Sequence, residues 1–265
     1  MKSKQWLPKL YLIIVLAIMY LPVIVVIVYS FNASKSDAVW GGFSLQWYGK
    51  MFSNTSLMEA LRNSLIVAAI SCLLSAVLGT LGAVGLVRSQ MKQKNMISNL
   101  SMIPIMIPEI IMGMVFLAVF SFLGLPFGMI TLIIAHISFC VPYIFLIVKG
   151  RLAGMDKSIE EAARDLGASP KRAFWDITLP MVMPAVLSGT LLAFAMSLDD
   201  VVISFFVTGP ETNTLPIKIY SQIKVGVSPE INALCTVMLL VTFLIVILSG
   251  RITKTKKHKK TEENK

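Results

Sequence analysis

LYLIIVLAIMYLPVIVVIVYS, residues Leu10–Ser30, decides the fold class, because none of its side chains is charged. An α-helix needs about 20 predominantly apolar residues to cross the hydrocarbon core of a bilayer. The run is too long for the apolar region of a secretory signal peptide, and it contains no small-residue cleavage site. It therefore predicts a first membrane-spanning helix that is not removed from the protein.

Five further apolar segments follow along the chain, separated by charged or turn-rich stretches. Apolar residues make up 56% of the 265 positions and charged residues only 14%, whereas a soluble domain is about 25% charged. We expect an all-α integral membrane protein with a single transmembrane domain over residues 1–265. The six spans are predicted at about 10–30, 61–87, 97–122, 129–149, 182–206 and 231–250.

The distribution of basic residues predicts the orientation of these spans. Six spans would place both chain ends and two of the loops on one side of the membrane. Of the 24 Lys and Arg residues, 19 lie in these segments and 5 lie in the loops on the other side. Cytoplasmic loops carry the excess of Lys and Arg, so both termini are predicted to be cytoplasmic. Attraction to anionic membrane lipid explains the net charge of +10, and we expect no nucleic-acid partner.

The sequence gives no sign of chemistry carried out by this chain alone. It contains no phosphate-binding GxxxxGK[ST] pattern, no HExxH motif and no Ser/His/Asp arrangement. Cys72, Cys140 and Cys235 lie in different apolar runs without metal-ligand spacing, and we interpret them as packing residues. His136 and His258 are also interpreted as structural. We expect no catalytic residue, no metal site and no cofactor.

The loop predicted at residues 150–180 is long, cytoplasmic and amphipathic. Its central part reads KSIEEAARDLGASPKRAFWDITLP from Lys157 to Pro180. Asp156 or Ser158 is suited to cap a helix, and Gly167 to end it in a left-handed turn. A second short helix is predicted after Ser169, and Pro180 with Pro184 is expected to bend the chain back into the membrane.

This loop resembles the EAA motif of ABC importer permeases over about 24 residues, in the spacing of its acidic, small and proline positions. The resemblance implies a type I ABC importer permease fold in which the loop docks on a separate ATPase subunit. It places Glu161, Ala162, Ala163, Gly167 and Pro180 in the coupling motif, with Phe174 as an apolar anchor. The alternative is a helical hairpin that rests on the membrane surface.

Other segments resemble the permeases of bacterial spermidine/putrescine importers, in particular the second permease subunit. They lie at residues 32–48, 197–210, 215–221 and 224–234. The resemblance implies a bacterial inner membrane protein that works with a second homologous permease subunit, two ATPase subunits and an extracytoplasmic substrate-binding protein. It also implies a polyamine as the transported solute.

Acidic side chains within the predicted spans support a cationic solute independently of the resemblance. Ionisable groups are costly in a membrane, so Glu109, Asp199 and Asp200 are candidates for the substrate path. Pro104 and Pro108 leave open that Glu109 only caps a broken helix. Successive residues of a helix point about 100° apart, so the two aspartates are not expected to face one cavity together.

Trp47 and Tyr48 are the aromatic candidates for the same path. Two interpretations stay open: stacking on ammonium groups by cation–π attraction, or anchoring at the membrane interface. The rival functions are a permease for a metal complex or a small anion, a secondary transporter that needs no ATPase, and a membrane scaffold without a path.

Overall fold

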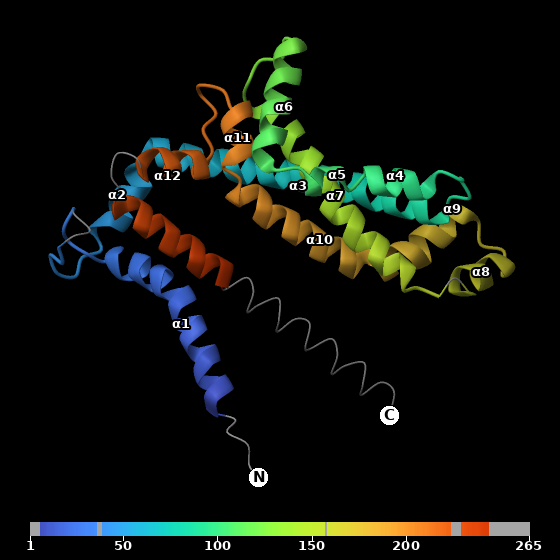
Figure 1. Cartoon of the computed structure of the whole chain (residues 1–265), viewed down its shortest axis with the longest axis horizontal. Helices are drawn as coiled ribbons and strands as arrows, with labels where there is room; N and C mark the ends of the chain where they lie inside the picture. Colours follow the sequence, from blue (N-terminus) through green and yellow to red (C-terminus); the bar gives the residue numbers. More distant parts are fainter. Residues whose placement is uncertain (1–5, 36–38, 157, 224–228, 244–265) are drawn as a thin grey trace. The chain divides into compact units, whose positions relative to one another are not determined.

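The computed structural model describes residues 6–35, 39–156, 158–223 and 229–243, and within them every regular element is helical. The chain divides into two compact units, one formed by residues 1–58 with 222–265 and the other by residues 59–221 (Figure 1). Four described helices are long and apolar enough to cross a membrane, or five if a sharply bent pair counts as one span. The predicted all-α class is confirmed.

The unit of residues 59–221 is centred on three long helices. These are α3 (Thr55–Arg88), α7 (Met129–Ala153) and α10 (Leu179–Asp199). Fully buried Ile144 of α7 lies between Gly79 of α3 and Gly189 of α10, where an added Cβ would come within 3.1 and 3.2 Å of it. Small residues at such contacts let helix backbones approach closely, which is how helices pack in lipid.

The segment predicted as a span at residues 97–122 is not one continuous helix. The segment forms α4 (Lys94–Leu100), α5 (Ile103–Met106) and α6 (Glu109–Phe122), with a bend of 102° between its two halves. Ile107 is extended at ψ 132°, because the ring of the following Pro108 disfavours the helical conformation. Glu109 therefore begins a helix instead of lying in the middle of one.

The predicted span at 182–206 is also interrupted. Helix α10 ends at Asp199, Asp200 is extended at ψ 117°, and α11 (Val202–Val207) starts two residues later. The carboxylate of Asp200 accepts hydrogen bonds from the backbone N–H groups of Ile203 and Ser204 at 3.1 and 2.7 Å. A short acidic side chain that bonds nearby backbone in this way competes with the helical hydrogen bonds and ends the helix.

The segment after α7 forms two short helices that lead into α10. Helix α8 (Ser158–Asp165) ends at Gly167, whose φ of +90° confirms the predicted left-handed turn. Ser169 caps α9 (Pro170–Ala173), and the π-helical turn η1 (Phe174–Thr178) joins it to α10. The helical run is continuous from Pro170 to Asp199. Pro180 lies in the first turn of α10 and Pro184 lies inside the helix, and the bend expected at these prolines stays a prediction.

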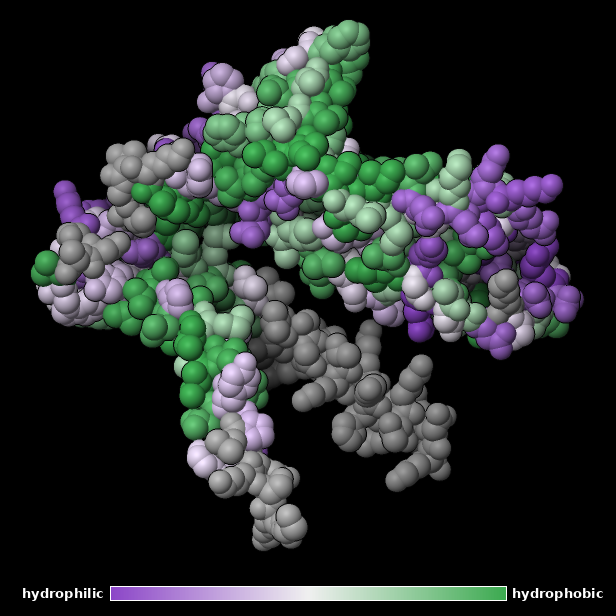
Figure 2. Space-filling model, viewed as in Figure 1, coloured by the Kyte–Doolittle hydropathy of each residue, from purple (hydrophilic) through white to green (hydrophobic). Residues whose placement is uncertain are grey.

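The hydrophilic surface of this unit gathers at one end. Figure 2 shows polar residues over α8, α9 and the neighbouring end of α4, whereas apolar residues cover α6 and the middle of the long helices. Leu73, Leu81 and Leu191 are among the many large apolar side chains that the helices expose. Such apolar surface along long helices is expected of a protein whose solvent is lipid.

The second unit contains α1 (Trp6–Tyr29), α2 (Gln46–Ser53) and a shorter apolar helix at Pro229–Phe243. The turn after α1 folds around Asn32, whose side chain bonds the backbone of Val39 and Gly41. The predicted sixth span at 231–250 ends outside the described residues, as do both chain termini. The division into six spans stays a prediction.

Candidate functional site

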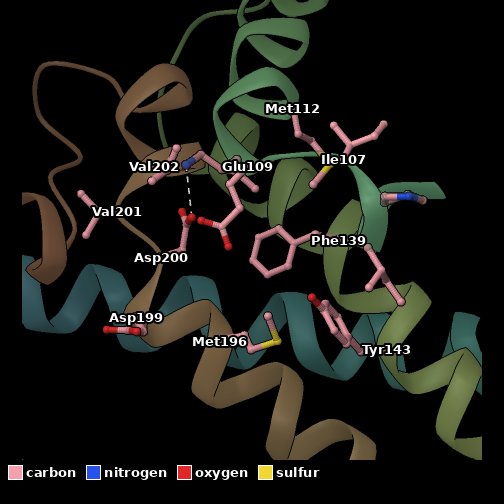
Figure 3. A pocket seen from close by; sticks show the side chains of 13 residues that line it. Ile107, Glu109, Met112, Phe139, Tyr143, Met196, Asp199, Asp200, Val201 and Val202 are labelled. Atoms are coloured by element: carbon pink, nitrogen blue, oxygen red, sulfur yellow. Dashed lines mark hydrogen bonds between the residues drawn. The ribbon is translucent and has the colours of Figure 1, made fainter. Parts of the chain in front are cut away.

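A cavity of about 280 Å³ lies where the two interrupted spans of the 59–221 unit meet (Figure 3). The Ile107–Pro108 break borders it on one side and the Asp200–Val201 break on the other. Because both breaks place acidic side chains at the same point, the cavity has carboxylates in an otherwise mostly apolar wall. It is lined by Pro104, Ile105, Ile107, Glu109, Met112, Phe139, Tyr143, Met196, Asp199, Asp200, Val201, Val202 and Ile203.

Asp200 is held rigidly in the wall of this cavity. Its side chain is only 5% exposed, and it accepts three hydrogen bonds from the first turn of α11: from the N–H of Ile203 and from both the N–H and the hydroxyl of Ser204. A buried carboxylate needs such partners to stay ionised without a large free-energy cost. The carboxylate therefore borders the cavity and caps α11 at the same time.

Glu109 is held much more loosely. It is exposed, and no hydrogen bond to its carboxylate is found among the described residues. Its position as the first residue of α6 is favourable for a negative charge, since the positive end of the helix dipole lies there. Figure 3 shows the carboxylates of Glu109 and Asp200 pointing toward each other across the cavity. One of the two acids is thus fixed and the other is available to a ligand.

Asp199 occupies a different position from its neighbour. It is exposed at the last turn of α10, and in Figure 3 its carboxylate points away from Glu109 and Asp200. Both aspartates line the cavity, contrary to the expectation, but their carboxylates point in different directions (Figure 3). The reason differs from the expected helical rotation, because the chain leaves the helix between them.

The remaining walls of the cavity are aromatic and thioether side chains that the sequence did not single out. Phe139 and Tyr143 come from α7, Met112 from α6 and Met196 from α10 (Figure 3). Aromatic faces attract ammonium groups, and none of the described lining residues is Lys or Arg. Among the described residues, no group of three His, Cys, Asp or Glu is arranged to hold a metal ion. The cavity is suited to an organic cation.

Trp47 and Tyr48 lie in the other unit and support its fold. Trp47 is 3% exposed and its indole N–H donates to the carbonyl of Asn32, so the interpretation as an exposed interfacial anchor is wrong. The ammonium of Lys50 lies 4.4 Å from the Trp47 ring centroid. The Tyr48 hydroxyl shares a hydrogen bond of 2.8 Å with Ser30. A role for either aromatic in the path stays a prediction.

The predicted coupling residues form an exposed polar surface. Glu161, Ala162 and Ala163 lie on α8, and Gly167 follows the helix. A hollow of about 430 Å³ opens beside them, lined by Glu161, Arg164, Asp165, Gly167, Ala168 and Pro170. Asp156 accepts a hydrogen bond of 3.0 Å from the N–H of Ser158 at the start of α8. Hydrogen bonds from Ser158 hold the pKa of this exposed carboxyl below its usual value.

Arg88, at the end of α3, connects this surface to the helix bundle. Its guanidinium forms an ion pair with Glu160 of α8 and a hydrogen bond with the Thr178 hydroxyl of η1. It also lies 6.0 Å from the ring centroid of Phe174. A guanidinium presents several donors in a fixed plane, which suits it to hold three segments together. Glu160, Phe174 and Thr178 lie 72 to 90 positions after Arg88, and no sequence pattern connects them with it.

Phe174 points inward, contrary to its predicted use as an apolar anchor for a partner. It is half-buried and packs against the hydrophobic core of the unit, because the π-helical turn places it under Arg88. The loop instead exposes Leu166, at 90%, and Trp175, at 63%. Together with Ile159, at 42%, these two side chains are the large apolar groups that the loop exposes.

Comparison with known proteins shows similarity to one family of transport proteins. Residues 73–256 match the family described as "binding-protein-dependent transport system inner membrane component". The chain is 43% identical over 240 residues to the Escherichia coli K12 spermidine/putrescine transport system permease protein PotC, covering 91% of each chain. It is 42% identical over 247 residues to the putrescine transport system permease protein PotI of the same organism, covering 89% of this chain and 88% of that one.

Solved structures extend the similarity to the fold. A bacterial ABC transporter that imports alginate matches with a TM-score of 0.73 at 15% identity, covering 94% of both chains. The MetNI methionine ABC transporter matches with a TM-score of 0.56 at 18% identity, covering 75% of this chain and 93% of the other. The fold is that of the type I ABC transporter permeases.

Proposed function

This chain belongs to the family of binding-protein-dependent transport system inner membrane components, and we propose that it forms half of the translocation path of an ATP-driven polyamine importer. The observation that carries the proposal is the pair of carboxylates, Glu109 and Asp200, that meet in a cavity between two broken helices. Broken helices at the substrate site are a recurring feature of membrane transport proteins.

The chemistry of the cavity favours a polyamine over the rival solutes. Glu109 and Asp200 supply negative charge, and the ring of Phe139 supplies an apolar face that also attracts ammonium groups. At an effective dielectric constant near 20, one pair of opposite charges about 4 Å apart is worth roughly 4 kcal/mol before desolvation. A small anion would meet two carboxylates and no basic side chain. The relatives named for spermidine and putrescine support the same choice.

The loop between α7 and α10 is the proposed docking site for the ATPase. Glu161 and Gly167 border its hollow, and exposed Leu166 and Trp175 supply apolar contacts. The helical run from Pro170 to Asp199, which includes the π-helical turn η1, joins this loop to the cavity and would transmit a movement of the loop. In the proposed assembly, two such permease subunits share the path, two ATPase subunits bind inside and an extracytoplasmic binding protein delivers the amine.

This arrangement requires α8 and both chain termini to lie in the cytoplasm, as the excess of basic residues predicts. Reporter fusions to the full chain test the orientation. An alkaline phosphatase reporter, which is active only outside the cytoplasm, should be active after Asn213 and inactive after Ala168. Activity after Ala168 would place the loop outside and overturn the proposed ATPase docking.

Uptake by the reconstituted importer tests the function itself. The chain, its partner permease, the ATPase and the binding protein are placed in proteoliposomes, and ATP-dependent uptake of labelled spermidine and putrescine is measured. Uptake of both amines, or of one, supports the proposal. Uptake of sulfate or of a metal chelate with no uptake of either amine would contradict it.

A further inference from the structure

His136 is an ionisable side chain buried deep in the 59–221 unit, and the substrate path described above does not include it. It lies on α7 with 1% of its side chain exposed, beside the break between α10 and α11. Its Nδ1 lies 2.7 Å from the hydroxyl oxygen of Ser197 on α10. Its Nε2 lies 3.0 Å from the hydroxyl oxygen of Ser204 on α11. One imidazole ring therefore connects three helices.

The ring also reaches the carboxylate of the cavity. Nε2 lies 3.5 Å from Oδ2 of Asp200, and the Ser204 hydroxyl between them donates to the same Oδ2 at 2.7 Å. Asp200 faces the cavity from an extended stretch of chain, at ψ 117°, between α10 and α11. The position of its carboxylate is set by the backbone N–H groups of Ile203 and Ser204 together with the Ser204 hydroxyl, and His136 acts on the last of these.

The hydrogen bonds have a definite direction. The Ser204 hydroxyl gives its hydrogen to Asp200, so its oxygen is free only to accept from His136, and Nε2 must carry a hydrogen. In a neutral imidazole, Nδ1 is then an acceptor and takes the hydrogen of the Ser197 hydroxyl. The series of hydrogen bonds runs from Ser197 through His136 and Ser204 to Asp200, and each donor in the series points toward the carboxylate.

We propose that His136 is a positioning residue of the polyamine site, which holds the Asp200 carboxylate facing Glu109 through Ser204. The inference rests on the proposed function, because it assigns His136 a role in the same site. Fixing a charged ligand group before the substrate arrives reduces the ordering that binding must otherwise impose. Loss of the hydrogen bonds from His136 to Asp200 through Ser204 should therefore weaken binding of the amine more than it slows the transport cycle.

Two substitutions of His136 separate this role from simple packing. The amide of His136→Gln reaches the position of Nε2 and can still donate to Ser204. The shorter amide of His136→Asn reaches only the position of Nδ1, beside Ser197. Ser138→Ala on the same helix is the control, because among the described residues the Ser138 hydroxyl bonds only the carbonyl of Ile134.

The measurement is ATP-dependent uptake of labelled spermidine by the complete importer over a range of concentrations. We expect His136→Asn to raise the apparent KM about tenfold, the effect of losing the buried hydrogen bond between His136 and Ser204. His136→Gln should stay within about twofold of wild type, and Ser138→Ala should match wild type. Maximal rate and co-purification of the ATPase subunit should change little in all three.

A double variant tests the connection through Ser204 directly. Ser204→Ala alone should raise the KM to a similar extent. The combination of His136→Asn with Ser204→Ala should raise the KM no further, because both substitutions interrupt the same series of hydrogen bonds. Multiplied effects in the double variant, or equal KM values for His136→Gln and His136→Asn, would overturn the inference while leaving the proposed function intact. A wild-type importer that takes up neither amine would overturn both.

Discussion

The helical run from Pro170 to Asp199 ends in two regions that use charge in opposite ways. At the α8–α9 end, ionic groups lie in water: Arg172 and Asp176 pair at 3.2 Å with side chains 76% and 61% exposed. At the cavity end, the Asp200 carboxylate is 5% exposed and fully bonded. Charges in water are screened and interact weakly, whereas buried charges interact strongly and must be held in place. The first arrangement suits reversible docking and the second suits capture of a cation.

The comparison separates the expected effects of mutations in the two regions. Changes near α8 should alter the coupling of transport to ATP hydrolysis and leave the affinity for the amine unchanged. Changes around the cavity should alter the affinity for the amine and leave association with the ATPase unchanged. The 30 residues of helix between the regions correspond to a length of about 45 Å along the helix.

The largest effect is expected at Gly167 in the loop. A valine at φ +90° is strained by about 2 kcal/mol, enough to reduce the population of the docking conformation about thirtyfold. We expect Gly167→Val to abolish most ATP-dependent uptake, and Gly167→Asn to be milder because asparagine tolerates left-handed conformations. Uptake and ATPase activity are measured together. Normal coupling in Gly167→Val would show that the docking region does not depend on the left-handed turn at Gly167.

A smaller effect is expected at Arg88. Arg88→Ala removes the ion pair to Glu160 and the hydrogen bond to Thr178. Partly exposed pairs contribute about 0.2–1 kcal/mol, so uptake should fall about 1.4- to fivefold, with an unchanged KM for spermidine. Arg172→Ala breaks a pair that is far more exposed and serves as the control, with no change expected. A raised KM in Arg88→Ala would show that the two regions are not separable.

The smallest effect is expected at Asp156, before α8. Hydrogen bonds from Ser158 lower the pKa of its carboxyl, so the ionised form stabilises the start of the helix. This contribution is complete above the ordinary pKa of about 4 and is lost as pH falls through the lowered value. Asp156→Ala should therefore loosen the Ser158 amide at neutral pH. The rate of hydrogen exchange of the loop in the intact subunit should increase less than threefold. An unchanged rate would show that Asp156 does not stabilise the start of α8.

The docking end was the more predictable region because its structure depends on local sequence. Gly167 ends α8 with a positive φ and Ser169 caps the next helix, as residue types and spacing indicate. The wrong prediction there, the orientation of Phe174, concerns a contact with Arg88, which is distant in sequence. A π-helical turn shifts every following side chain, and no residue type specifies it.

The cavity was predictable only in part. Its acidic residues were identified because charge within an apolar span is costly, but which aspartate faces inward depends on where α10 ends. The role of His136 requires Ser197 and Ser204, which lie more than 60 positions along the chain. Polar side chains in apolar runs are a usable signal for such a network, although their pairing emerges only when the helices are packed.

The most direct test of the central claim is the charge at Glu109. The KM for spermidine is measured for Glu109→Gln and for Glu109→Asp in the reconstituted importer, with co-purification of the ATPase as the control for assembly. We predict a KM raised at least about fivefold in Glu109→Gln, because even a quarter of a 4 kcal/mol charge interaction has that effect. Glu109→Asp, which keeps the charge, should stay closer to wild type. A wild-type KM in Glu109→Gln would contradict a cation site between the broken helices.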